Sequence, residues 1–413
     1  MSLRTRTTLG LVAAMAASVV VVAPAAAKSA PQCGQTVTAS TKLKHDLVGC
    51  AGNGLVVGAD NITIDLNGHS IRGVNAPGSI GIADDGHQRV KIKNGTIADF
   101  FVNGVRLHDA ARSVVRNMHI VRIGDGGVEG QFSAGVLIDA SAGVKVSDSF
   151  ISNAVQAFQS DGIDILGSPG AVVRGNRIVR NSWNGVVAIE SPHSQVVRNV
   201  LDGNGNQGIE VNAGSDAVVL ARNIARGNTQ SGLVVGAVHG ARVVDNRLSG
   251  NNGAGLFSFD LIDSLIAGND SRNNGEGIEL TGGQFGSHGN RILRNRTDGN
   301  LDVGILLEEN ANANRVSGNS VTGNREAQGA GILVFASTGN VIDDNDVDRN
   351  AGDGIGIFEE VPGTAAGNTL TRNTAKRNGG HGINSAVDGT IDGGGNKARA
   401  NGTPPDCVGV VCS

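Results

Sequence analysis

Four side chains in the first half of the chain carry groups that can bind or cleave sugars: Arg106, His108, Asp139 and Asp164. Two carboxylates that flank a glycosidic bond can act as general acid and as base or nucleophile. An arginine or histidine can instead act as the base beside a substrate uronate. The other interpretation is a solvated polar face with ordinary ion pairs. Because the four residues lie far apart in the sequence, any shared role requires a fold that brings them together.

A repeat with a period near 23 residues indicates what that fold is. Glycine followed by Ile, Val or Leu marks thirteen repeats between Gly81 and Gly382, most often 23 residues apart. A stricter pattern, Asn-x4-Asn, occurs in ten consecutive repeats from Asn176 to Asn401. Apolar residues alternate with others after each glycine, which is typical of short strands with one face in a core. Asparagine tolerates the left-handed backbone of a sharp bend.

These patterns predict an all-β solenoid of about 13 or more coils, each made of three short strands and three bends. The second and fourth residues after each repeat glycine should point outward. The four candidate residues would then lie on three successive coils. Strand geometry would place His108 about 5 Å from Asp139, and Asp139 roughly 8 Å from Asp164. The longest insertion, Arg122–Ala134, would lie between two of these coils and could wall a cleft.

The Gly-Ile-x-Val and Asn-x4-Asn rungs resemble those of the right-handed parallel β-helix proteins of the pectate-lyase-like superfamily. The segment Asn61–Gly73 is also similar to the usual first coil of that family. The resemblance covers residues 33–402 and implies a single-stranded right-handed parallel β-helix with a carbohydrate partner. It does not assign an activity, because the repeated Asn and Gly residues are scaffold and fold alone does not determine function.

Two branches of that superfamily can be compared with particular residues. Ser191-Pro192-His193-Ser194 is similar to the Asp-Pro-His-Asp motif of the mannuronan epimerases, with both acids replaced by serine. The loss of both carboxylates argues against an epimerase mechanism. The copper-accessory branch would need soft ligands, but only Met118 remains once a leader is removed, and the histidines are scattered. The sequence therefore predicts no soft copper site.

Calcium is the one cofactor that the sequence brings into consideration. Asp344, Asp346 and Asp348 are expected on one strand face, and hard cations prefer such oxygen ligands. The run lacks the glycine spacing of calcium-binding nonapeptide repeats. Solvated acids are the other interpretation, and no other cofactor or metal is expected.

The two ends of the chain have distinct predicted roles. Residues 1–27 have the basic start, the short apolar run and the small-residue cleavage site of a signal peptide. Residues 28–60 are expected to cap the β-helix of residues 61–402, and residues 403–413 to close its other end. The four cysteines lie two near each end, which favours the pairs Cys33–Cys50 and Cys407–Cys412. We expect a secreted protein with disulfide bonds and no membrane span.

The net charge and the arginine content of the chain limit the classes of polymer that it is expected to bind. The formal net charge is −4, so no basic surface on the scale that nucleic acid needs is expected. Of the 34 basic residues, 26 are arginine. Arginine binds carboxylates through a fork of donors, which would suit an acidic polymer, although solvated surface arginines are the other interpretation.

The later coils should carry an outward apolar face. If exposed, this face could stack sugars or dock a partner. We expect instead that loops cover it or that it mediates self-association. Its predicted members are Val234, Phe257, Phe259, Leu306, Leu333, Phe335 and Phe358.

Two functions remain open from the sequence. The first is a secreted enzyme, a lyase or hydrolase of acidic glycans, that uses Arg106, His108, Asp139 and Asp164. The second is a non-catalytic extracellular rod that binds glycan or protein partners. A groove lined by the polar cluster would favour the first, and a flat face without loops would favour the second.

Overall fold

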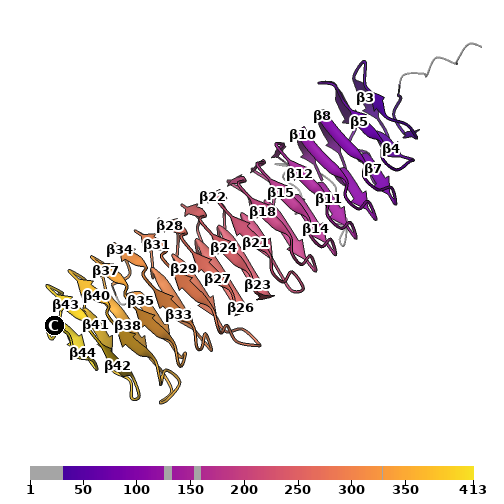
Figure 1. Ribbon diagram of the computed structural model, residues 1–413. Helices are drawn as coiled ribbons and strands as arrows, with labels where there is room; N and C mark the ends of the chain where they lie inside the picture. The colour runs from indigo at the N-terminus through magenta and orange to yellow at the C-terminus, as the bar shows by residue number, and fades with distance from the viewer. Residues whose placement is uncertain (1–30, 125–132, 153–159, 328) are drawn as a thin grey trace, which may run out of the picture. The chain divides into compact units, whose positions relative to one another are not determined.

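The computed structural model describes residues 31–124, 133–152, 160–327 and 329–413, and the secondary structure in these ranges consists of strands. The strands stack as coils, one above the next, from the indigo to the yellow end of Figure 1. Each coil contributes one strand to a long parallel sheet, called sheet A here, and two strands to the opposite side. The predicted all-β parallel β-helix, with three strands in each coil, is confirmed.

Sheet A has 16 strands, and each pairs in parallel with the strand one coil away. These strands are β1 (Gln35–Val37), β4 (Leu55–Val57), β7 (Ile80–Asp85), β9 (Asn103–His108), β11 (Ser133–Asp139), β14 (Ser160–Leu166), β17 (Val186–Ile189), β20 (Ile209–Val211), β23 (Leu233–His239), β26 (Leu256–Ile262), β29 (Ile278–Thr281), β32 (Ile305–Glu308), β35 (Ala330–Phe335), β38 (Asp353–Phe358), β41 (Ile383–Ser385) and β44 (Cys407–Val408).

The other two strands of each coil form two further parallel stacks, called stack B and stack C here. Stack B contains β2 (Thr41–Lys42), β5 (Thr63–Asp65), β8 (Lys91–Phe100), β10 (Val114–Ile123), β12 (Lys145–Ser147), β15 (Val172–Arg174), β18 (Gln195–Val197), β21 (Val219–Ala221), β24 (Arg242–Val244), β27 (Leu265–Ala267), β30 (Arg291–Leu293), β33 (Arg315–Ser317), β36 (Val341–Asp343), β39 (Thr369–Thr371) and β42 (Ile391–Gly394). Stack C shares β8 and β10 and adds β3 (Leu47–Cys50), β6 (Ser70–Gly73), β13 (Phe150–Ser152), β16 (Arg177–Val179), β19 (Val200–Asp202), β22 (Ile224–Arg226), β25 (Arg247–Ser249), β28 (Asp270–Arg272), β31 (Arg296–Asp298), β34 (Ser320–Thr322), β37 (Asp346–Asp348), β40 (Thr374–Lys376) and β43 (Lys397–Arg399).

The core is a column of aliphatic side chains inside the stack. In β17, for example, Val186 and Ala188 are fully buried, and the same positions of the next coil are filled by Ile209 and Val211. The repeat glycine precedes each of these strands because neighbouring coils approach closely there. A Cβ on Gly185 would lie 2.5 Å from the carbonyl oxygen of the next repeat glycine, which is closer than any real side chain tolerates.

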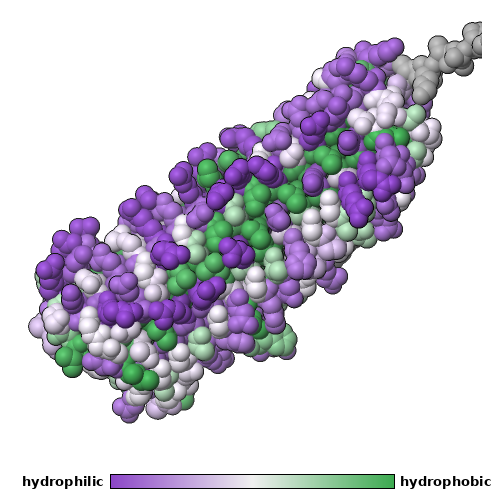
Figure 2. Space-filling model, in the orientation of Figure 1, coloured by the Kyte–Doolittle hydropathy of each residue, from purple (hydrophilic) through white to green (hydrophobic). Residues whose placement is uncertain are grey.

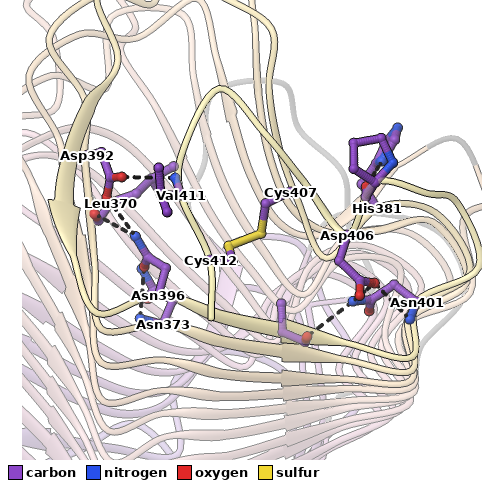
Figure 3. Close-up of a disulfide and its surroundings, with 12 residues drawn as sticks. Leu370, Asn373, His381, Asp392, Asn396, Asn401, Asp406, Cys407, Val411 and Cys412 are labelled. Carbon is purple, nitrogen blue, oxygen red and sulfur yellow. Dashed lines mark hydrogen bonds between the residues drawn. A yellow bond between two sulfur atoms is a disulfide. The ribbon is translucent and has the colours of Figure 1, made fainter.

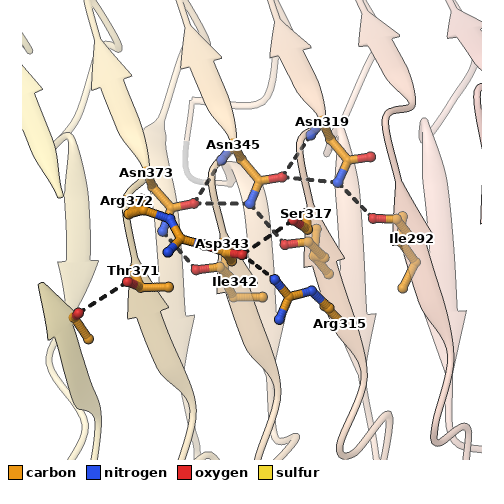
Figure 4. A network of polar contacts seen from close by, with 12 residues as sticks. Ile292, Arg315, Ser317, Asn319, Ile342, Asp343, Asn345, Thr371, Arg372 and Asn373 are labelled. Atoms are coloured by element: carbon orange, nitrogen blue, oxygen red, sulfur yellow. Dashed lines mark hydrogen bonds and ion pairs between the residues drawn. The ribbon is translucent and has the colours of Figure 1, made fainter. Parts of the chain in front are cut away.

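Both asparagines of each Asn-x4-Asn pair form continuous ladders, which confirms the predicted stacking. Asn223 donates from Nδ2 to Oδ1 of Asn246 at 3.1 Å, and Asn246 donates to Asn269 at 2.9 Å. One ladder runs without a gap from Asn176 to Asn396, and Figure 4 shows three of its members. The second runs from position 181 to position 401. Because the amides are buried, each link satisfies groups that would otherwise lose their bonds to water.

The ends are closed by the two predicted disulfides, Cys33–Cys50 and Cys407–Cys412. Residues expected as an N-terminal cap form the first coil, since β1 pairs with β4. At the other end, Asp406 accepts hydrogen bonds from the backbone and side chain of Asn401 and thereby ends the second ladder (Figure 3). The predicted signal peptide lies outside the described residues. Among those described, no helix has the length and hydrophobicity of a membrane span.

Candidate functional site

The structure brings His108 and Asp139 together. They end strands β9 and β11 and are direct neighbours in the register of sheet A. His108 Nδ1 lies 2.7 Å from Asp139 Oδ2, and His108 Nε2 lies 3.6 Å from Asp109 Oδ2. Arg106 turns to the preceding coil, where its Nη2 donates to Asp85 Oδ2 at 2.5 Å. The result is a partly exposed imidazole between carboxylates, with the guanidinium engaged by a different acid.

Asp164 does not join this group. It lies in the same file as Arg106, with Leu137 between them, but its side chain is only 1% exposed. Neither of its carboxyl oxygens has a hydrogen-bond partner among the described residues, and the neighbouring acid Asp161 adds negative potential. Burial raises the pKa of Asp164 well above its usual value, and burial also raises the pKa of Asp161 to about 6. The expected pairing of Asp139 with Asp164 across a solvent-exposed cleft is therefore wrong.

The physical reason is the neighbourhood of Asp164 in sheet A. Leu137 and Val187 flank it on the adjacent coils, and both are buried although they point outward. An outward position in the repeat is therefore not always an exposed one. Most of the insertion that was expected to wall the cleft, residues 125–132, lies outside the described residues.

A second pair of carboxylates, Glu279 on β29 and Glu308 on β32, lies on the same sheet further along the stack. Glu279 is the register partner of Leu306, and Glu308 lies two residues beyond it on the same strand. The two carboxyls are close enough for each to affect the pKa of the other. Burial is the largest cause that raises the pKa of Glu279, to about 8, and it also raises the pKa of Glu308.

Two more acids, Glu276 and Asp302, stand at the starts of the same two coils. Burial raises the pKa of both carboxyls. Among the described residues, no Arg, Lys or His forms an ion pair with any of these four acids. With a pKa of about 8, Glu279 therefore holds a proton at neutral pH that an isolated carboxyl would lose. Glycosidases use one protonated and one ionised carboxyl, placed about 5 to 9 Å apart on either side of the scissile bond.

Surface hollows adjoin the strand that carries Glu308. One hollow of about 220 Å³ is lined by Phe285, His288, Asn310, Asn312 and neighbouring loop residues. A second, of about 440 Å³, shares Asn310 and Asn312 and reaches Glu309, the residue after Glu308. Phe285 is 68% exposed. Amide side chains around an exposed ring offer the hydrogen bonds and the apolar face that a sugar ring needs.

Asp260 holds the loop that carries Phe285. Its carboxylate, at the end of β26, accepts from the backbone N–H groups of Gln284, Phe285 and Gly286 at 3.1, 2.6 and 2.9 Å. The close contact requires glycine at position 283, where φ is +57° and a Cβ would lie 2.6 Å from the carboxylate. The phenyl ring is thus presented by a fixed turn.

The Ser191–Ser194 turn, similar in sequence to an epimerase motif, has a scaffold role. Ser191 Oγ accepts from the backbone N–H of Ser168 and donates to backbone carbonyl oxygens, as a step in a ladder of buried serines. Ser194 Oγ donates to the carbonyl oxygen of Ser168 at 3.4 Å. His193 is exposed in a left-handed conformation with φ 59°. The two serines therefore satisfy the backbone of the coil.

The acids considered for calcium do not share one strand face. Asp344 occupies a left-handed bend between β36 and β37, with φ 55°, which corrects the expected alignment. Asp346 pairs with Lys376 at 3.0 Å, and Asp348 pairs with Arg377. Asp343, just before the bend, is buried and is bound by Arg315 and by Arg372 (Figure 4).

The apolar face of the later coils is partly covered. On the face that Figure 2 draws, apolar residues form a band among polar ones. Val234 is buried, and the phenylalanines and leucines of the face are intermediate in exposure. Phe259 lies flat over Gly236 of the preceding coil, and Phe358 covers Gly356 on its own strand. The rings fold onto the sheet, so they do not form a broad exposed patch.

Sequence reasoning missed the Glu279–Glu308 pair, although both are outward positions of the repeat. They are one coil and two residues apart, the same offset that was applied to Asp139 and Asp164. A search for that offset in every coil would have found them. The hollows beside Phe285 had no such signal, because their loops lie outside the repeat.

Comparisons with known proteins agree with this architecture. A family model described as "Periplasmic copper-binding protein (NosD)" matches residues 87–285, 133–325 and 266–393. The crystal structure of the periplasmic alginate epimerase AlgG is similar, with 16% sequence identity and a TM-score of 0.52 over 79% of this chain and 77% of that chain. The A-module of the mannuronan C-5 epimerase AlgE4 from Azotobacter vinelandii has 11% identity and a TM-score of 0.48 over 88% and 90%. Curated protein sequences give no significant match.

Proposed function

Because the chain belongs to the family described as periplasmic copper-binding protein (NosD), whose model matches more than half of its length, we propose that it is an exported β-helix protein that binds or acts on polysaccharide. Export is supported by the family description and by two disulfides, which persist in oxidising compartments. A polysaccharide ligand is supported by the fold that the chain shares with an alginate epimerase.

The observation that carries the proposal is the half-buried Glu279–Glu308 pair beside the hollows lined by Phe285, Asn310 and Asn312. A sugar chain on sheet A would have a ring to stack on, amides to bond to and two carboxyls within the same surface. Isolated acids on a flat face would not offer this combination.

If the protein is catalytic, the pair suits the cleavage of a glycosidic bond. Glu279 holds a proton that it can donate to the leaving oxygen. Glu308, on the adjacent coil, can act as base or nucleophile. The reaction class would then be hydrolysis, with a lyase reaction on a uronate as the variant in which a base removes a ring proton.

The test is a panel of acidic and neutral polysaccharides incubated with the purified mature protein. Reducing ends report hydrolysis, and ultraviolet absorbance reports the unsaturated product of a lyase. We expect binding to at least one polysaccharide, weakened in Glu279→Gln and Glu308→Gln and unchanged in Glu190→Gln, which alters an exposed turn far from the pair. Binding of no polysaccharide by the parent protein would overturn the proposal.

The His108–Asp139 contact supports a second candidate centre. An imidazole at 2.7 Å from a carboxylate is a familiar base, and Arg106 lies on the same strand. Asp164 would contribute to this centre only through the buried pair that it forms with Asp161. His108→Ala would abolish product formation if this centre acts, whereas the Glu279 and Glu308 variants would leave it intact.

The alternative function is a non-catalytic rod that binds glycan or protein partners. The half-buried phenylalanines of the later coils support this alternative, because they leave apolar edges on the surface for contact or self-association. Polysaccharide binding without any product, together with unaltered binding in all variants of His108, would favour it.

The described residues do not fit the copper ion in the family description. Copper prefers imidazole, thiolate and thioether ligands. All four cysteines are in disulfides, the Met118 side chain is 2% exposed inside the core, and the described residues contain no group of three His, Cys, Asp or Glu that could hold a metal. We therefore assign no step to copper. Calcium bound by the acids near Asp346 stays a proposal, which calorimetry with calcium alone would test.

A further inference from the structure

One part of the surface is strongly basic although the chain as a whole is acidic. The segments 172–180, 195–203 and 219–227 cover stacks B and C over three successive coils. They contain six arginines and one carboxylate, Asp202. The arginines are Arg174, Arg177, Arg180, Arg198, Arg222 and Arg226. Asp202 is already bound to Arg226 at 2.8 Å, so the positive charge of this surface is not neutralised from within.

Three of these residues form a line along the stack, called the arginine row here: Arg174, Arg198 and Arg222. Arg198 and Arg222 occupy the left-handed bend before a ladder asparagine, with φ 58° and 56°. Arg174 ends β15 and is the register partner of Val197, the residue before Arg198. The fold therefore places one guanidinium on each coil, at a spacing of about 4.8 Å between coils.

The arginine row surrounds a hollow. An open depression of about 200 Å³ is lined by the three arginines, with Val197 and Ala221 as its apolar floor. Side chains on three different coils therefore border one space. A ligand lying along the stack would meet all three charges and a small apolar surface together.

Most of these charges have no acidic partner. Arg222 is 3.6 Å from Asp245, and both side chains are well exposed. Among the described residues, no carboxylate forms an ion pair with Arg174, Arg177, Arg180 or Arg198. The arginines near the C-terminus differ, because Arg315 and Arg372 are bound to the buried Asp343 (Figure 4). The arginines of this face are thus neutralised near Asp343 and left without an acidic partner in most of the basic segments.

We propose that the arginine row binds an anionic polysaccharide with one carboxylate on each sugar, lying along the stack, an inference that rests on the proposed function. Guanidinium groups bind carboxylates through paired donors. A polyuronate repeats its charge once per sugar ring, a length comparable with the step between coils. The three basic segments contain no aromatic residue, so they lack the stacking surface that single-stranded nucleic acids use.

The test uses polygalacturonate as the probe, with a neutral polysaccharide and single-stranded DNA in parallel, measured by titration calorimetry over a series of salt concentrations. Arg174→Gln/Arg198→Gln should weaken polygalacturonate binding about tenfold or more and reduce its salt dependence. The matched control, Arg296→Gln/Arg325→Gln, removes the same charge from a distant coil and should bind like the parent. Arg174→Lys/Arg198→Lys should restore part of the affinity, because it keeps the charge but loses the fork.

Unchanged polygalacturonate binding in the double glutamine variant would overturn this inference, as would tighter binding of DNA by the parent protein. Thermal unfolding of each variant shows whether it is folded. We expect every variant to fold, because the substituted arginines are exposed. A parent protein that binds the neutral polysaccharide through sheet A but not polygalacturonate would reject the arginine row and keep the proposed function. A parent protein that binds neither would reject both.

Discussion

Glu279 and Glu308 are neighbouring half-buried carboxyls on two adjacent coils of sheet A. Two such groups repel each other when both are ionised, which favours the state in which one of them keeps its proton. The surrounding burial selects Glu279, and the nearby Glu276 and Asp302 add negative potential that favours the neutral form. Glu279 is thus the protonated member of a pair of carboxyls that the stacking of the coils places near each other.

The first prediction concerns pH and stability. Burial raises the pKa of Glu279 from 4.5 to about 8, so the folded state keeps a proton that the unfolded chain releases. Between these values the unfolded state binds fewer protons, and the free energy of unfolding should fall as pH rises from about 4.5 to 8. Glu279→Gln should reduce this fall by about 1–2 kcal/mol, since partial exposure screens the effect. Denaturant titrations at pH 5 and pH 9 measure it, and parallel curves for variant and parent would contradict it.

The second prediction concerns Asp164. Burial raises the pKa of Asp164 well above its usual value, so the folded protein keeps this proton over a pH range in which the unfolded chain has released it. Asp164→Asn should then preserve the fold and gain about 1 kcal/mol in the free energy of unfolding near neutral pH, where the parent bears the cost of keeping the proton. At pH 4 the two proteins should be equally stable. A variant that is less stable at both pH values would show that the aspartate is ionised in the fold.

The third prediction concerns the loop held by Asp260. Asp260→Ala removes the acceptor for three backbone N–H groups and should release the turn that presents Phe285. We expect glycan affinity to fall about tenfold, comparable with the loss of a hydrogen bond to a charged group. Limited proteolysis should cut the variant within residues 282–290. Asp344→Asn, an exposed aspartate in a distant bend, is the control and should alter neither readout.

The fourth prediction concerns the ladders. Asn246 accepts from the backbone and the side chain of Asn223, and it donates to Asn269 and to Leu220. Asn246→Ala should lower the free energy of unfolding by about 2–4 kcal/mol, because buried partners are left unpaired. Asn252→Ala, an exposed asparagine outside the ladder, should cost less than 0.5 kcal/mol by the usual effect of surface changes. Urea unfolding of the two variants makes the comparison, and equal losses would refute a special role for the ladder.

The fold could be predicted from the sequence because its constraints recur. A ladder asparagine is needed once in every coil, so ten copies reveal a role that one copy would hide. The contact of His108 with Asp139 followed from the same register. The burial of outward-pointing side chains does not follow the repeat, however. Asp164 is buried by Leu137 and Val187, and nothing in the repeat marks those neighbours as buried.

The Phe285 loop shows a second limit. Its shape depends on a carboxylate, Asp260, that lies on the preceding coil and far from the loop in sequence. The repeat predicts where an inserted loop leaves the stack, but it does not predict which side chain forms the hydrogen bonds that fix the loop. Sites built from insertions therefore remain invisible to a pattern search, whereas sites built from the rungs can be found by their offset.

The two uninterrupted asparagine ladders imply that this chain can lose or gain a whole coil and keep its ladders in register. Excision of residues 223–245 would set position 199 against position 246, and position 204 against position 251, with every amide again facing an amide. A difference of a few residues must be taken up by a loop, as it is in the coils whose ladder asparagines are 24 to 28 residues apart. Evolution or engineering can thus shorten or extend the β-helix by whole coils. Each coil gained or lost between the acidic and the basic surface changes the distance between them by the height of one coil.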